Sequence, residues 1–287
     1  MRRLYKYSLD ASVKGTKYLA IDHTAEEHSR TMGDYSAEIG YRKKNDFFKK
    51  YFYGYQYNRL QYYDVFLRRH LKRDEEILSI ASGRCANEAL LLEDGFRVIC
   101  SDLRHFGIHD RSRALFANFD FIELDILKQG VPRKMDAIIC LSLAPYFDTG
   151  QLRRFFSNIS EGLKPNGKLI LELTGPSDNL ASYLLNDIYL RWEILLLRAF
   201  KFLTLGKSYG VLMKHGCFCW GDAEILALAN ESNLILEEKT NYDFITEFRR
   251  STLLSWLLDR HDVFKRLFAV AGKPIPHIRM FYFKKAL

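Results

Sequence analysis

Residues 77–103 constrain the fold of this 287-residue chain more than any other stretch. A short apolar run is followed by the small residues of 81–83, which predict a tight turn. A helical pattern over 86–91 leads to a second apolar run, 98–100, which ends just before Asp102. This strand, turn, helix, strand and acid form the unit that places backbone amides and a helix N-terminus against a nucleotide-like ligand.

From residue 74 onward, strand patterns alternate with helix patterns, which is typical of a parallel α/β sheet. Apolar runs predict five further strands, at 121–124, 137–141, 168–173, 234–237 and 278–283. A helix with inward-facing apolar residues over 152–163 should end at the turn residues of 164–167, Lys-Pro-Asn-Gly.

Two insertions, 178–220 and 246–271, interrupt the alternation. The first predicts one long helix over 178–204, followed by a hairpin or extended pair over 207–220. The long helix carries apolar residues at every third or fourth position, so it could act as a lid, a dimer face or a membrane-surface helix. Packing against the N-terminal segment is the simplest interpretation, and the second insertion is predicted to be helical.

The N-terminal segment, residues 1–73, carries the whole net charge of +8, with 16 Lys and Arg against 8 Asp and Glu. Its second half, 41–73, is basic and rich in tyrosine, and ends in a predicted helix with Leu60, Tyr63 and Leu67 on one side. Interleaved aromatic and basic residues can bind single-stranded nucleic acid. They can equally form a cap over a ligand site, which is the interpretation we favour for 1–73, with 74–287 as the main domain.

Composition bears on metal binding and on the expected cellular location of the protein. The five cysteines are odd in number and their spacing fits no zinc motif, so no metal is expected. The N-terminus lacks the apolar core of a signal peptide, and no stretch is long and apolar enough for a membrane span. We therefore expect a reduced, cytoplasmic protein, while its oligomeric state is left open.

Four features in this order resemble the class I S-adenosylmethionine-dependent methyltransferases, from about residue 57 to the C-terminus. They are the strand-loop-helix of 78–92, Asp102, Asp125, and the run of 135–139 followed by 162–171, Gly-Leu-Lys-Pro-Asn-Gly-Lys-Leu-Ile-Leu. The resemblance implies a Rossmann-like seven-stranded, mostly parallel sheet with helices on both faces and an antiparallel last strand. To this fold the chain would add an N-terminal helical cap and the helical insertions.

The resemblance also implies that S-adenosylmethionine is the cofactor. Gly83 would let the backbone approach it, Asp102 would take the ribose hydroxyls, and Asp125 would accept from the adenine amino group. The remaining implied contacts are Leu103 and Ile126 around the adenine ring, and Leu141 and Ser142 at the methionine end.

The loop departs from the family's acidic-x-Gly-x-Gly-x-Gly pattern. Ser79 stands at the acidic position, Ala81 at the first glycine and Cys85 at the last. Ser79, Ala81 and Gly83 are still expected to line the cofactor, and Glu88 could supply the carboxylate that Ser79 lacks.

The segment after the fourth strand bears on the acceptor. Residues 143–146, Leu-Ala-Pro-Tyr, lack the polar residue and first proline of family members that methylate base amines. A small-molecule or sugar hydroxyl is the favoured acceptor, with His215 as candidate base and Tyr146 as the residue that orients the acceptor. Two alternatives stay open: an RNA methyltransferase using the basic N-terminal arm, and a non-catalytic scaffold protein.

Overall fold

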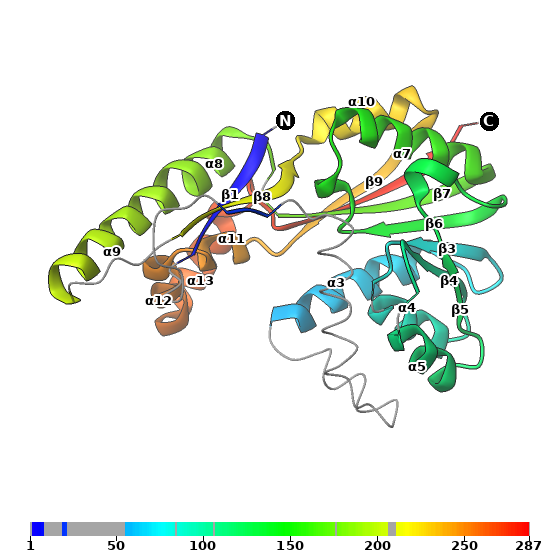
Figure 1. The fold of residues 1–287 in the computed structure, drawn as a ribbon, viewed down its shortest axis with the longest axis horizontal. Helices are drawn as coiled ribbons and strands as arrows, with labels where there is room; N and C mark the ends of the chain where they lie inside the picture. Colours follow the sequence, from blue (N-terminus) through cyan, green and yellow to red (C-terminus); the bar gives the residue numbers. More distant parts are fainter. Residues whose placement is uncertain are drawn as a thin grey trace. The chain divides into compact units, whose positions relative to one another are not determined.

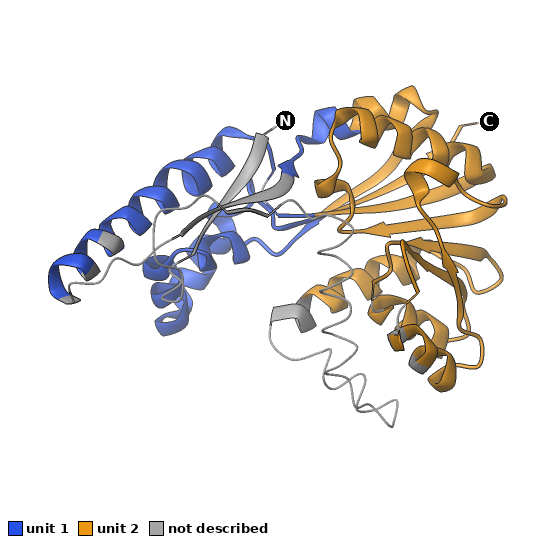
Figure 2. Cartoon of the chain, viewed as in Figure 1, with its two compact units in different colours: residues 1–23, 174–225, 241–278 blue, residues 24–173, 226–240, 279–287 orange. Residues whose placement is uncertain are grey.

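The computed structural model describes residues 2–8, 19–21, 55–83, 85–105, 107–175, 177–205 and 211–286. The chain divides into two compact units (Figure 2). Unit 1 comprises residues 1–23, 174–225 and 241–278, and unit 2 comprises 24–173, 226–240 and 279–287. The N-terminal segment is thus shared between the units, which differs from a single boundary at residue 73.

A seven-stranded sheet belongs mainly to unit 2 and has the order β5-β4-β3-β6-β7-β10-β9. Its strands are β3 (Glu76–Ile80), β4 (Arg97–Asp102), β5 (Asp120–Glu123), β6 (Met135–Leu141), β7 (Leu163–Thr174), β9 (Leu234–Tyr242) and β10 (Ile278–Lys285). Strands β3 to β7 pair in parallel, and the last strand is antiparallel. The predicted Rossmann-like fold is confirmed, and its strand order reverses between β3 and β6, the position where ligands bind in such sheets.

The centre of the sheet is apolar on both faces because helices surround it. In β6, Ala137, Ile138, Ile139 and Cys140 are all fully buried. The helices of this unit are α3 (Tyr55–His70), α4 (Ala86–Glu93), α5 (Gly107–Leu115), α6 (Ile126–Gln129), α7 (Thr149–Gly162) and most of α10 (Asp222–Glu231), whose first four residues belong to unit 1. Figure 1 shows α7 on one side of the sheet and α3, α4 and α5 on the other. The predicted inward stripe of α3, formed by Leu60, Tyr63 and Leu67, is buried, as is Leu71 just after the helix.

The turn predicted at 164–167 lies inside β7. Asn166 there has a left-handed backbone, with φ of 59°, and the pairing of β6 with β7 shifts register between Met135 and Ala137. Asn and Gly tolerate that backbone, so the same residues can form either a turn or a bulge within a strand. Periodicity alone could not distinguish the two.

Unit 1 contains a second, three-stranded sheet. Strand β8 (Val211–Cys219) pairs antiparallel with β1 (Arg2–Ser8) and parallel with β2 (Leu19–Ile21). The predicted hairpin or extended pair over 207–220 is therefore wrong for the described residues 211–219, which form one strand. Its partners lie about 200 residues earlier in the chain, so no local pattern could reveal them.

The rest of unit 1 is helical. A continuous helical run consists of α8 (Leu180–Tyr183), the π-helical segment η2 (Leu184–Tyr189) and α9 (Leu190–Leu205), which confirms the long helix predicted over 178–204. The second insertion forms α11 (Thr246–Arg249), α12 (Thr252–Arg260) and α13 (Asp262–Ala271). Phe248, Leu258 and Ile275 are the buried centre of a small core here. None of the described helices combines the length and apolar character that crossing a bilayer requires.

Candidate cofactor-binding site

The loop after β3 has an unusual backbone at three alternate positions. Ala81, Gly83 and Cys85 have φ angles of 53°, 54° and 57°, in the left-handed region. Only glycine adopts this region without cost, and a non-glycine residue loses about 1 kcal/mol or more there. The loop therefore keeps the backbone of a glycine-rich turn although two of the three glycines are absent.

Asp102, at the end of β4, holds this loop. Its Oδ2 accepts a hydrogen bond from the amide of Gly83 at 2.9 Å, and its Oδ1 accepts from the amide of Leu103 at 2.7 Å. The residue is only 3% exposed. A Cβ added to Gly83 would meet nothing within 4 Å, so the space in front of this residue is open. The acid predicted to bind a ligand also fixes the backbone beside it.

Glu88, on the first turn of α4, is the buried acid next to Ser79. The hydroxyl of Ser79 donates to its Oε1 at 2.5 Å, and burial raises the pKa of Glu88 to about 7. The second oxygen, Oε2, is buried and has no hydrogen-bond partner among the described residues. Glu88, on the helix that follows the loop, thus brings beside Ser79 the carboxyl group that position 79 lacks, as the sequence suggested.

His109, on α5, is a neighbour of the loop that the sequence did not single out. It is fully buried, its ring stacks on Phe121 with centroids 3.8 Å apart, and its Nε2 lies 2.8 Å from the carbonyl oxygen of Gly83. Burial lowers the pKa of His109. A neutral imidazole protonated at Nε2 donates a hydrogen bond to this carbonyl oxygen and so helps to hold the loop in place.

The predicted adenine-side residues follow the ends of β4 and β5. Asp125 caps α6: its Oδ1 accepts from the amide of Leu127 at 3.1 Å, and its Oδ2 lies 2.9 Å from Lys128 Nζ. Ile126 is buried, whereas Leu103 is exposed. The amide of Leu124 donates to the carbonyl oxygen of Asp102, at 2.8 Å, and thereby ties the two strand ends together.

At the end of β6, Leu141 leads into Ser142, whose φ is 63°. The Ser142 hydroxyl donates to Glu172 Oε2 at 2.7 Å, and Arg59 of α3 donates to the same hydroxyl. Glu172, on β7, is fully buried and lies 3.8 Å from the Arg59 guanidinium. This charged group was missed, although Glu172 is the one acid within the apolar run of residues 169–173.

All nine predicted cofactor residues thus lie at or just after the carboxyl ends of four adjacent strands, β3, β4, β5 and β6. Neither of the two catalytic candidates, Tyr146 and His215, lies directly at these strand ends. Tyr146 ends the short 3-10 helix η1 (Ala144–Tyr146) of unit 2 and is 40% exposed. His215 lies on β8 of unit 1, opposite Ile21 in the register, and its side chain lies outside the described part of the structure. The tyrosine-rich residues 51–54 also lie outside it.

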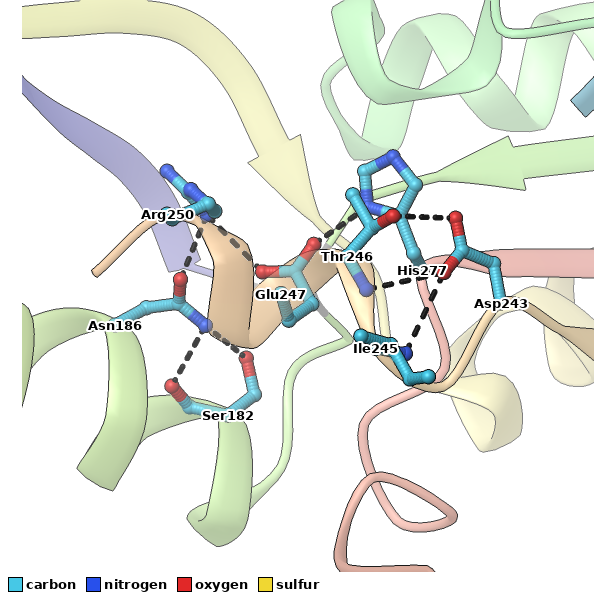
Figure 3. A network of polar contacts seen from close by, with 8 residues as sticks. All are labelled: Ser182, Asn186, Asp243, Ile245, Thr246, Glu247, Arg250 and His277. Atoms are coloured by element: carbon cyan, nitrogen blue, oxygen red, sulfur yellow. Dashed lines mark hydrogen bonds and ion pairs between the residues drawn. The ribbon is translucent and has the colours of Figure 1, made fainter. Parts of the chain in front are cut away.

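Unit 1 holds a buried polar network of its own (Figure 3). Glu247 Oε1 lies 2.6 Å from His277 Nδ1, and Arg250 joins Glu247 at 3.1 Å and Asn186 Oδ1 at 2.6 Å. Burial alone would raise the pKa of Glu247, but the bond from His277 and the charge of Arg250 outweigh it and lower the pKa to about 2. The network joins the π-helical segment, α11 and the residue before β10. Within the described residues no cluster of His, Cys, Asp and Glu could hold a metal ion.

No model of a known protein family matches the sequence, and no curated protein matches it significantly. Solved structures do match. The 1,6-didemethyltoxoflavin-N1-methyltransferase of Burkholderia thailandensis superposes with a TM-score of 0.54 at 12% identity, over 98% of each chain.

Two further matches are similar in extent. Magnesium protoporphyrin IX methyltransferase of Synechocystis PCC 6803 gives a TM-score of 0.52 at 11% identity, over 92% of this chain and 96% of that one. Geranyl diphosphate C-methyltransferase of Streptomyces coelicolor A3(2) gives 0.51 at 14%, over 96% and 90%. Likeness at this level of identity establishes architecture, and this chain has the fold of the class I methyltransferases.

Proposed function

We propose that this chain is an S-adenosylmethionine-dependent methyltransferase that acts on a hydroxyl of a small molecule or sugar. The observation that carries the proposal is the loop after β3. Ala81 and Cys85 hold the backbone that glycine would adopt without strain. Strain of this kind persists where the surrounding structure imposes it, and it concentrates at ligand sites. The three neighbours of known fold described above, all solved with S-adenosylhomocysteine, support the same cofactor.

The residues present fit this cofactor. The unpartnered buried oxygen of Glu88 suits a positively charged amino group, and the amides at the start of α4 suit a carboxylate. Asp102 would hold the ribose hydroxyls and Asp125 the adenine amino group, with Leu103 and Ile126 beside the ring. Ser79, Ala81, Gly83, Leu141 and Ser142 would complete the binding residues.

When bound, S-adenosylmethionine supplies a methyl group on a positively charged sulfur. The protein's task is then to hold the acceptor oxygen in line with that group and to exclude water. A hydroxyl acceptor also needs a base, and His215 is the residue we propose for that role, with Tyr146 orienting the acceptor. An acceptor on a sugar or glycan would present such hydroxyls.

The acceptor class can be tested with S-adenosylmethionine labelled in its methyl group. The full chain is incubated with a small-molecule and glycan extract or with total RNA, and label is followed into each fraction. We expect label in small molecules or glycans, and none after Asp102→Ala. Transfer into RNA, weakened steeply by salt because phosphate contacts release counterions, would replace our acceptor with the RNA alternative. No transfer at all would favour a scaffold protein.

A further inference from the structure

Helix α9 of unit 1 presents its apolar side to solvent. At about 100° per residue, one side of the helix holds seven apolar residues. These are Trp192, Leu195, Leu196, Ala199, Phe200, Phe202 and Leu203, and all are exposed. The exposed fraction reaches 61% for Trp192 and 82% for Leu203. In a globular protein the apolar side of a helix normally faces the core. In α9 it faces solvent instead.

The opposite side of α9 attaches the helix to its unit. Glu193, Ile194 and Leu197 are half-buried, and Glu193 Oε1 accepts from the amide of Leu253 on α12 at 2.8 Å. The half-buried side of α9 thus carries a charged residue, Glu193. The larger apolar side of the helix has no partner in the described structure. The sequence alone could not show which side would be buried.

Apolar exposure is concentrated in unit 1. Fifteen of the nineteen large apolar side chains that are exposed in the described residues belong to it. On α12, Leu253 and Trp256 are exposed, and on α13 the row Val263, Leu267 and Val270 is exposed, with no residue of that helix buried. A soluble monomer rarely exposes so much apolar surface without a binding role.

Positive charge accompanies this surface. Helix α9 holds three Lys and Arg against one Glu, and Arg191 is exposed next to Trp192. Aromatic and aliphatic side chains bordered by cations match an anionic bilayer, which attracts the cations while the apolar groups enter the headgroup boundary. A second copy would bring the same positive charge against this face.

We propose that unit 1 docks on the surface of an anionic phospholipid bilayer through the exposed apolar side of α9. The helix lies on the bilayer, since none of the described helices is long and apolar enough to cross it. This docking is separate from the proposed methyl transfer, because it needs neither cofactor nor acceptor.

The test is co-sedimentation of the full chain with vesicles of phosphatidylcholine, with and without phosphatidylglycerol. We expect binding to the anionic vesicles that is about tenfold or more tighter than to the neutral ones and that falls with salt. The double variant Leu196→Gln/Phe200→Gln keeps the charge and should lose about tenfold or more in affinity, since two large apolar groups no longer enter the boundary.

The matched control is Val65→Gln/Ile235→Gln, which changes two exposed apolar residues of unit 2. It should bind vesicles like the wild type. Absence of wild-type binding to anionic vesicles, or equal binding by the α9 variant, would overturn the proposal. So would light scattering that shows a dimer which the α9 variant dissociates, because the face would then be covered by a second copy.

Discussion

The Asp102 carboxylate accepts a hydrogen bond from the amide of Gly83, at 2.9 Å. The bond joins the end of β4 to the loop that follows β3, across the neighbouring carboxyl ends of two paired strands. The acid that the sequence assigns to a ligand is therefore also part of the loop's support. Variants at this residue need a stability measurement beside every binding measurement.

Ala81→Gly should raise the free energy of unfolding by up to about 1 kcal/mol, because it relieves a left-handed alanine. The same change at Ala89, which is buried in the helix α4, should lower that free energy by about 1 kcal/mol or more. Urea denaturation of both variants gives the comparison. Equal destabilisation by the two changes would mean that the loop is unstrained.

Glu88→Gln should change how stability depends on pH. The folded-state pKa of Glu88 is about 7, above the ordinary value of 4.5, so its stabilising contribution is complete below pH 4.5 and is lost as pH rises through 7. The wild type should lose about 3 kcal/mol between these limits through this group, and the variant should not. Urea unfolding from pH 4.5 to 8 measures the difference, and parallel curves for the two proteins would contradict it.

Glu247→Gln tests the network of unit 1. The pKa of Glu247 is lowered to about 2, so its contribution is present above pH 4.5 and is lost as pH falls toward 2. At pH 7 the variant should be less stable by about 3 kcal/mol, and the difference should shrink in acid. Asp259→Asn, which breaks the exposed pair with Arg249, should have little effect at either pH. An equally small effect of Glu247→Gln would rule out a structural role.

His215→Asn should lower the rate of methyl transfer about 100-fold or more if this histidine is the base, while binding of S-adenosylhomocysteine stays unchanged. Tyr146→Phe should lower the rate less, since it removes an orienting hydroxyl and no base. The rate is followed against pH with the acceptor that the labelled screen identifies. An unchanged pH profile for His215→Asn would remove this residue from the mechanism.

The sheet could be predicted because its signals are local. The apolar runs of β3, β4, β6 and β7 are bounded by turn residues, and parallel strands buried on both faces read as such runs. The pairing of β8 with β1 and β2 could not be predicted, because it joins segments about 200 residues apart. The outward side of α9 was equally hidden, since its periodicity fits burial as well as exposure.

In the candidate site, acids at strand ends could be predicted and buried partners could not. Asp102 and Asp125 follow apolar runs directly, which is a visible signal. Glu172 and Arg59 meet at Ser142 only through the packing of α3 beside β6 and β7. Nothing in the sequence distinguishes His109 from other helical residues. Only the fold brings its ring within hydrogen-bond distance of the Gly83 carbonyl oxygen.

The central claim is that this site binds S-adenosylmethionine, and calorimetric titration with S-adenosylhomocysteine tests it most directly. We predict saturable binding by the wild type and a loss of about tenfold or more for Asp102→Ala, because hydrogen bonds to a charged group are removed. Asp120→Asn, at the amino end of β5, should bind like the wild type, and urea unfolding shows that each variant is folded. No binding by the wild type at about millimolar ligand, or unchanged binding by folded Asp102→Ala, would contradict the claim.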